Sequence, residues 1–147
     1  MSAFDRAFVA FAGKERLGRH GHGGPILIRA TAADTGGTYG IWETISPPGT
    51  GPGRHVHTRE TELFQVLEGT YRMECGDDAF EISAGSLVVL PPDVPHAWTN
   101  ISERPGRMLG MVTPGGFEAM FLDIAAENLS THDEIVEVHA RYGVTLF

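Results

Sequence analysis

Three histidines and one glutamate carry the clearest chemistry in this sequence. His55 and His57 lie one residue apart in RHVHTRETE, Glu62 ends that stretch, and His96 follows the segment PPDVP. Imidazole nitrogens and carboxylate oxygens bind borderline divalent metals such as iron, manganese, nickel, copper, cobalt and zinc. The pattern therefore predicts one divalent metal held by His55, His57, Glu62 and His96.

The spacing of these residues requires two strands and a turn. Alternate residues of a strand share a face, so His55 and His57 point together, about 6–7 Å apart along the strand. Glu62 is an odd number of residues beyond His57 and would face away in an unbroken strand. The polar TRET between them is typical of a turn or bulge, which resets the alternation. The alternative is that these side chains meet no common ion.

A site of this composition favours oxygen anions. Four protein ligands around an ion that accepts six leave open positions for a substrate or for dioxygen. A divalent ion and one carboxylate leave a net charge of about +1, which suits an enolate, carboxylate or catecholate oxygen. Arg54 and Arg59 flank the ligand stretch and are interpreted as a solvated rim, with steering of an anionic substrate as the alternative.

The elements that must position these ligands are short strands. Turn residues recur every ~8–12 residues through the middle of the chain, as in an all-β sandwich or barrel. Nineteen glycines and nine prolines fit that class. We expect strands near residues 25–31, 38–46, 53–57, 62–68, 70–75, 79–82, 86–91, 95–101 and 106–113.

The N-terminal residues 1–24 are predicted to form an arm. Phe4, Phe8 and Phe11 have the spacing of a short helix or a docking segment. The stretch GRHGHGG (18–24) is too rich in glycine for a regular element. His20 and His22 within it are interpreted as solvated loop residues.

The C-terminal residues 114–147 are predicted to form one or two short helices. Apolar residues between 117 and 124 repeat with helical spacing, and Thr131 with Glu134 forms a capping box for a second helix. His132 and His139 on that helix are interpreted as surface residues.

Length and composition predict one domain, with a barrel at residues 25–113. The formal charge of −8, with only 11 Lys and Arg, argues against nucleic-acid partners. No apolar run approaches the ~18–20 residues that cross a bilayer, and no signal peptide is recognised, so we expect no membrane partner and a cytoplasmic location. Cys75 is the single cysteine, which excludes an internal disulfide.

The two ligand stretches resemble the two motifs of the cupin superfamily. The first, G-x5-H-x-H-x4-E-x6-G, is matched by Gly49, His55, His57, Glu62 and Gly69. The second, G-x5-P-x-G-x2-H-x3-N, is matched by Gly85, Pro91, His96 and Asn100. Asp93 stands where that motif has glycine, and Asp tolerates the left-handed conformation better than most residues.

The resemblance implies a double-stranded β-helix, or jelly-roll barrel, with the metal inside it. It also implies a homodimer, with N-terminal strands exchanged or packed between subunits. The chain looks similar to the small single-domain cupins that resemble one half of the quercetin 2,3-dioxygenases.

Three functions remain open on the sequence alone. The first is a metal-dependent dioxygenase acting on an enolic or aromatic small molecule, with Glu62 as metal ligand and catalytic base. The second is a non-redox isomerase or polyketide-type cyclase, in which the metal acts as a Lewis acid. The third is a small-molecule-binding or sensor module without chemistry. The candidate walls of a substrate pocket are Phe64, Val66, Trp98, Met108 and Met111.

Overall fold

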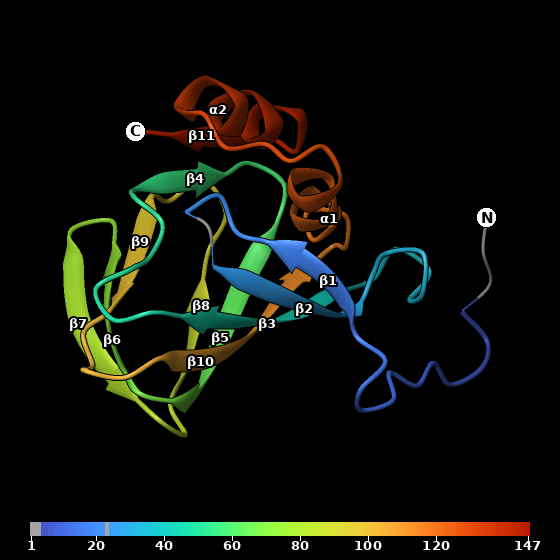
Figure 1. Ribbon diagram of the computed structural model, residues 1–147, viewed down its shortest axis with the longest axis horizontal. Coiled ribbons are helices and arrows are strands. Elements are labelled where there is room, and N and C mark those ends of the chain that lie inside the picture. Colours follow the sequence, from blue (N-terminus) through green and yellow to red (C-terminus); the bar gives the residue numbers. More distant parts are fainter. Residues whose placement is uncertain (1–3, 23) are drawn as a thin grey trace.

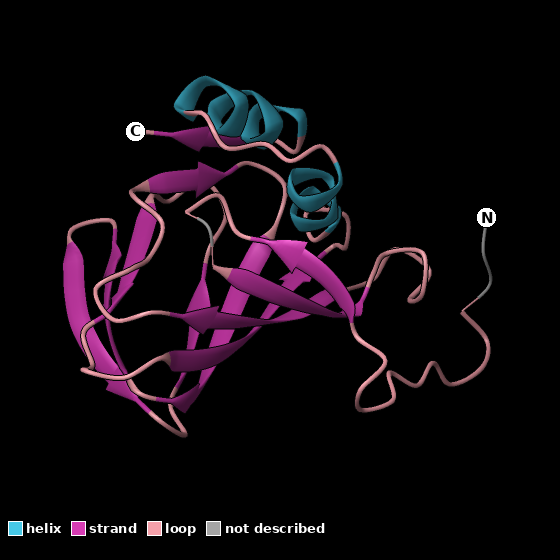
Figure 2. Ribbon diagram, viewed as in Figure 1, coloured by secondary structure: helices cyan, strands magenta, loops and turns pink. Residues whose placement is uncertain are grey.

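The structure, a computed structural model, describes residues 4–22 and 24–147. Its strands form two antiparallel sheets that pack around one core, with two helices at one end of the barrel (Figures 1 and 2). This is the predicted all-β jelly roll with short C-terminal helices. None of the helices in the described residues is long and apolar enough to cross a membrane.

The larger sheet has six strands in the order β1-β2-β3-β10-β5-β8, and the smaller has five in the order β11-β4-β9-β6-β7. The first six strands and their bounds are β1 (Arg16–Arg19), β2 (Pro25–Ala30), β3 (Gly40–Ser46), β4 (His55–His57), β5 (Thr61–Glu68) and β6 (Thr70–Cys75). The remaining elements are β7 (Asp78–Ser83), β8 (Leu87–Leu90), β9 (His96–Asn100), β10 (Gly106–Thr113), α1 (Ala119–Ala126), α2 (His132–Arg141) and β11 (Val144–Leu146).

The nine strands expected from the sequence all form, with small shifts at their ends. β1 and β11 were not expected. β1 overturns the prediction that residues 18–24 hold no regular element, because Gly18 and Arg19 pair with β2. Gly18 is needed there for a different reason: a Cβ at this position would lie 2.9 Å from the Cβ of Phe121 on α1. The glycine thus lets α1 pack directly on the strand.

The aromatic spacing of the N-terminal arm does not produce a helix. Residues 4–11 have no regular secondary structure, and Phe4, Phe8 and Phe11 are exposed. A helix of so few residues is marginal without extensive packing, and here Phe4 and Phe8 only line a shallow surface hollow beside Ala30 and Ile41.

The core fills the space between the sheets and beneath α1. It contains Trp42, Tyr71 and Met108 from the strands and Phe121 and Ile124 from the helix, all 2% exposed or less. Burying a side chain of this size contributes about 1.5–3 kcal/mol, so this cluster is the main source of stability. Trp42 lies 5.3 Å from Phe121 between ring centroids, which joins the larger sheet to the helix.

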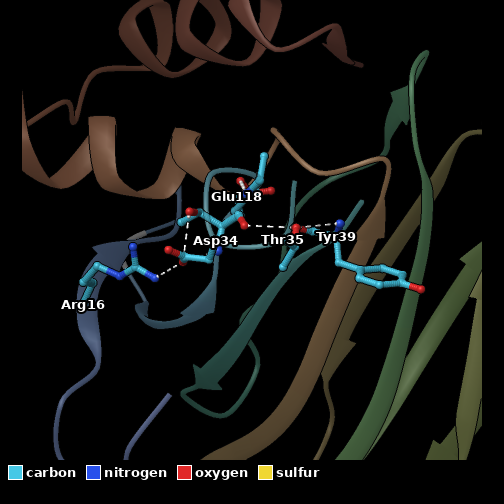
Figure 3. A network of polar contacts seen from close by, with 7 residues as sticks. Arg16, Asp34, Thr35, Tyr39 and Glu118 are labelled. Carbon is cyan, nitrogen blue, oxygen red and sulfur yellow. Dashed lines mark hydrogen bonds and ion pairs between the residues drawn. The ribbon is translucent and has the colours of Figure 1, made fainter. Parts of the chain in front are cut away.

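The start of α1 is fixed by a buried carboxylate. Glu118 accepts hydrogen bonds from the backbone N–H of Ala32 at 3.0 Å and of Gly116 at 2.6 Å. The segment that contains Ala32 is itself braced, because Asp34 forms an ion pair with Arg16 at 2.6 Å (Figure 3). α1 is therefore held against the β2–β3 connection, over the end of the barrel that contains the predicted ligands.

The second helix begins as the sequence predicts. The Thr131 side chain accepts from the backbone N–H of Glu134, and the Glu134 carboxylate accepts from the backbone N–H of Thr131. After α2 the chain turns into β11, which pairs with β4 and places the C-terminal segment beside the ligand strand (Figure 1).

Candidate metal centre

The structure brings the four predicted ligands together. His55 and His57 come from β4, His96 from β9 and Glu62 from β5, and their exposed fractions lie between 1% and 7%. Their nitrogen and oxygen ligand atoms all lie within 4.8 Å of one another. Glu62 Oε1 is 3.0 Å from His96 Nε2 and 3.8 Å from His57 Nε2, so the carboxylate sits between two rings.

The turn between His57 and Glu62 resolves their odd spacing. β4 ends at His57 in the smaller sheet, and β5 begins at Thr61 in the larger sheet. The side chains of His57 and Glu62 therefore approach each other from opposite sheets rather than along one strand. The sequence-based expectation of two strands and a turn is met.

Hydrogen bonds outside the cluster orient two of the imidazoles. His55 Nδ1 lies 2.8 Å from the Gly53 carbonyl oxygen, and His57 Nδ1 lies 3.2 Å from Glu60 Oε2. Each of these oxygens can only accept, so each bond places the ring proton on Nδ1. The Nε2 atoms are then left as unprotonated acceptors facing the cluster, which is the form that a metal ligand needs.

One buried nitrogen of the cluster indicates whether a cation fits among the four side chains. His57 Nε2 is buried and has no hydrogen-bond partner among the described residues. Buried polar atoms are nearly always paired, and an unpaired acceptor facing a carboxylate and two imidazoles has the surroundings of a metal ligand. Three imidazoles and one carboxylate are also a donor set that divalent transition metals bind. The residues present therefore fit a divalent metal.

The charge states agree with this fit. Burial lowers the pKa of His55 to about 3, with a further contribution from His96, so the His55 ring is neutral. Burial would raise the pKa of Glu62, but the three neighbouring histidines outweigh it and lower that pKa, so the carboxylate is ionised. Burial opposes a charge on His57 as well, yet Glu62 and Glu60 raise its pKa. A proton therefore competes with a metal mainly at His57.

Glu60 was not identified from the sequence. Glu60 is 4% exposed, and its carboxylate forms a hydrogen bond with His57 Nδ1. A carboxylate on the outer nitrogen of a ligand histidine fixes the ring and increases its basicity. One feature of the sequence could have indicated this role: Glu60 is an acidic residue inside the TRET turn, three residues after the predicted ligand His57.

A small cavity lies beside the ligands. Its volume is about 20 Å³, enough for one molecule the size of water. Besides His55 and Glu62, its walls are His20, Trp42, Pro52, Phe64, Trp98, Phe117, Met120, Phe121 and His139. Aromatic side chains from β3, β5, β9 and the α1 region therefore enclose the cluster, and water from the bulk is largely excluded.

The predicted pocket walls divide into three groups. Phe64 and Trp98 line the cavity. Val66 and Met108 are buried in the core but do not line it. Met111 is three residues beyond Met108 on β10, so it lies on the opposite, partly exposed face of the sheet. The prediction for Met111 overlooked that odd spacing.

Two histidines interpreted as solvent-exposed are buried at this cavity. His20 is 9% exposed and His139 is 5% exposed, and both are walls of the cavity. Burial lowers the pKa of each ring. No local pattern indicates this burial, because it depends on α1, α2 and the β1–β2 loop packing over one end of the barrel.

Residues 42–112 match the Cupin domain family. This stretch, just under half of the chain, is a cupin domain. The four ligand side chains lie within the matched residues, and the helices that cover them lie outside.

Three curated proteins share sequence with this chain. Over 67 residues it is 33% identical to an uncharacterised protein of Methanocaldococcus jannaschii, covering 46% of this chain and 54% of that protein. Over 89 residues it is 26% identical to the polyketide synthase CurC of Streptomyces cyaneus, covering 60% and 56%. Over 100 residues it is 28% identical to the quercetin 2,3-dioxygenase of Bacillus subtilis, covering 67% and 29%. The chain thus spans about half the length of the first two relatives.

Solved structures share the fold over most of the chain. KdgF from Halomonas sp. superposes with a TM-score of 0.68 at 15% identity, covering 78% of this chain and 99% of that one. An RmlC-like cupin from Shewanella frigidimarina superposes with a TM-score of 0.64 at 16% identity, covering 77% and 96%. At such identities the likeness shows the cupin fold alone.

Proposed function

We propose that this cupin is a metal-dependent dioxygenase acting on an enolic or aromatic small molecule. The observation that carries the proposal is the buried set of three histidines and one glutamate facing an enclosed cavity with aromatic walls. A redox-active divalent metal held there would supply both a Lewis acid and an electron-transfer centre. The distant likeness to the quercetin 2,3-dioxygenase of Bacillus subtilis supports this class of reaction.

The chain's own residues have three tasks in this proposal. His55, His57 and His96 hold the metal with Glu62. The Glu62 carboxylate, kept ionised by its histidine neighbours, takes the proton from the substrate hydroxyl. Phe64 and Trp98, with Phe121 of α1, keep the site dry, which protects reactive species from water.

The metal is tested first. Protein purified without an affinity tag should contain about one divalent transition metal per chain by elemental analysis, as four ligands in one cluster predict. The variants His55→Ala and Glu62→Ala should each lose it. Unchanged metal content in both variants would refute the site itself.

The reaction is tested with an oxygen electrode. Metal-loaded protein should consume dioxygen when mixed with members of a panel of small enols and 1,3-diketones, and consumption should match substrate loss. Equal turnover of a confirmed substrate under anaerobic conditions would exclude a dioxygenase.

A non-redox cyclase is the second candidate, because the chain is 26% identical over 89 residues to the polyketide synthase CurC. The same buried ligands would then hold a Lewis-acidic metal that stabilises an enolate during ring closure. Cyclisation of a poly-β-ketone substrate without dioxygen consumption, supported by zinc, would favour this candidate over the first.

We also propose that the protein is a homodimer. The outer face of the larger sheet is apolar and partly open, with Leu87 and Val89 each 56% exposed on β8. Phe11 on the N-terminal arm is 68% exposed. Light scattering coupled to gel filtration would give twice the monomer mass, and a monomer at high concentration would exclude this arrangement.

A further inference from the structure

A second, larger cavity lies outside the one beside the metal ligands. Its volume is about 230 Å³, and its walls come from the β1–β2 loop, the segment before β4, helix α2 and the C-terminal segment. We call it the outer pocket; it is lined by His20, Gly21, His22, Gly51, Pro52, Gly53, Arg54, His132, Ile135, His139, Leu146 and Phe147. His20, Pro52 and His139 line both cavities, so they form the partition between them.

The polar side chains of the outer pocket are all nitrogen bases. Four histidines and Arg54 line it, and no aspartate or glutamate side chain is among its lining residues. This composition contrasts with the chain as a whole, which carries a formal charge of −8. A pocket that excludes carboxylates and presents one guanidinium and several imidazoles attracts an anion.

The hydrogen bonds of the histidines leave donors free. His20 Nδ1 accepts from the backbone N–H of His22, at 3.5 Å, which places the proton of the neutral ring on Nε2. His22 has both ring nitrogens buried without a hydrogen-bond partner among the described residues. Whichever nitrogen of His22 holds the proton, one buried N–H has no acceptor. Burial lowers the pKa of His22 to about 4, so the ring is a neutral donor rather than a permanent cation.

The packing holds these rings in place. The ring centroids of His20 and His22 are 3.8 Å apart, and each lies 5.8 Å from Trp98, edge to face. A side chain at Gly21 would meet Ile135 at 3.0 Å and His139 at 3.3 Å, so the loop fits closely against α2. His22 lines the pocket with its ring while its nitrogens are covered by neighbouring groups, so a ligand would reach the unpaired N–H through a small rotation of the side chain.

The size and walls of the pocket limit the ligand. A volume of about 230 Å³ is below the ~300–1,000 Å³ usual for drug-sized ligands, so the occupant is small. Ile135, Leu146 and Phe147 give it an apolar side. A single ring or a short chain with one anionic group satisfies both the apolar and the basic walls.

We propose that the outer pocket binds a small organic acid, with its carboxylate on Arg54 and His22 and its apolar part against Ile135 and Leu146. The inference goes beyond the proposed function: the partition separates the outer pocket from the metal ligands, so the acid is a ligand of a second site and not the substrate at the metal. The binding itself needs no metal, because none of the groups that hold the carboxylate is a metal ligand.

The test uses benzoate as the probe and benzyl alcohol as its neutral counterpart. Both are titrated calorimetrically into the full chain after removal of metal with a chelator. Benzoate should bind with a millimolar or tighter dissociation constant, and benzyl alcohol about tenfold more weakly or worse, since it lacks the charge that pairs with Arg54. Equal affinity for the two probes, or no benzoate binding, would overturn the proposal.

Three variants locate the binding. Arg54→Gln and His22→Phe should each weaken benzoate binding about tenfold, the loss expected for one charge-assisted or donated hydrogen bond. His22→Phe keeps a ring of similar shape, so it remains informative if Arg54→Gln, which also loses a bond to the Gly76 carbonyl, fails to fold. Arg141→Gln on the exposed side of α2, where Arg141 pairs with Glu127, is the matched control and should bind like the wild type. Wild-type affinity in His22→Phe and Arg54→Gln would refute the assignment.

One further variant separates this proposal from the proposed function. His55→Ala should lose the metal and still bind benzoate. If benzoate binds only metal-loaded protein and is lost in His55→Ala, the acid binds at the metal and the outer pocket is not its site, although the dioxygenase proposal would stand. If metal-free protein binds benzoate but no substrate consumes dioxygen, the outer-pocket proposal stands and the dioxygenase fails.

Discussion

Replacing Glu60 with glutamine should weaken metal binding without removing any ligand. Glu60 Oε2 lies 3.2 Å from His57 Nδ1, and both side chains are almost fully buried. The carboxylate orients the ring and, by its charge, makes the opposite nitrogen a stronger donor. Glutamine keeps an acceptor of the same size in the same place but removes the charge.

The size of the effect follows from what each substitution removes. Loss of such an outer partner costs about 10- to 100-fold in metal affinity, or about 1.4–2.8 kcal/mol. Glu60→Gln retains the hydrogen bond, so we expect a loss of about tenfold. Glu60→Ala loses both the bond and the charge, so we expect about a hundredfold. The exposed Glu68 on β5 offers the matched control, and Glu68→Gln should bind metal like the wild type.

The pH dependence sharpens this prediction. Burial works against protonation of His57, but Glu62 and Glu60 raise its pKa above the ordinary value. In the wild type a proton therefore competes with the metal at moderately acid pH, and this competition is weaker in Glu60→Gln. The loss of affinity in the variant should be largest at alkaline pH and shrink as the pH falls. Competition titrations against a chromophoric chelator, using zinc at several pH values, measure both quantities. Equal affinities of Glu60→Gln and wild type at alkaline pH would refute the role given to Glu60.

Three further predictions concern stability, measured by urea unfolding of the metal-free protein. Phe121→Ala removes a side chain that is 2% exposed and contacts Trp42, so it should cost about 3–5 kcal/mol; a loss below about 1 kcal/mol would contradict the packing described. Burial raises the pKa of Asp34, but hydrogen bonds from Arg16 and from the Thr31 backbone and hydroxyl outweigh it, so the folded pKa is lowered. The Asp34 carboxylate therefore stabilises the fold at pH values above about 4, the pKa of this group in the unfolded chain. This stabilisation disappears as the pH falls through the lower pKa of the folded state. Asp34→Asn should be about 0.5–1 kcal/mol less stable at pH 7, allowing for partial exposure, with a difference that shrinks at the lowest pH; a constant difference would argue against titration of Asp34. Asp93 has a φ of 64°, so Asp93→Ala should cost about 1–2 kcal/mol and Asp93→Gly much less, and equal effects would exclude backbone strain as the reason.

The strands and the ligand set could be predicted because their determinants are local. Alternation of side chains and the turn residues between them mark β2 to β10, and the pattern His55, His57, Glu62 needs only one turn to become a cluster. Asp93 takes the left-handed conformation that the glycine of the motif would take, so the turn before His96 survives the substitution.

The rest of the site could not be predicted because it depends on contacts between distant segments. His139 looks like a surface residue on its own helix, and only the packing of α2 against the barrel turns its ring toward the cavity. His20 lies in a glycine-rich stretch that would be flexible without pairing between β1 and β2. Met111 is a different case, because its odd spacing from Met108 already excluded a shared face.

The origin of the four ligands has a consequence for folding. Two strands of the smaller sheet supply the histidines, and β5 of the larger sheet supplies Glu62. A metal ion bound to all four would be a crosslink between the two sheets, joining segments that are far apart along the chain. Because the ion binds the folded state alone, its removal should lower the unfolding temperature by an amount that depends on free metal concentration. Zinc or iron starvation of a cell would then reduce the amount of folded protein as well as its activity.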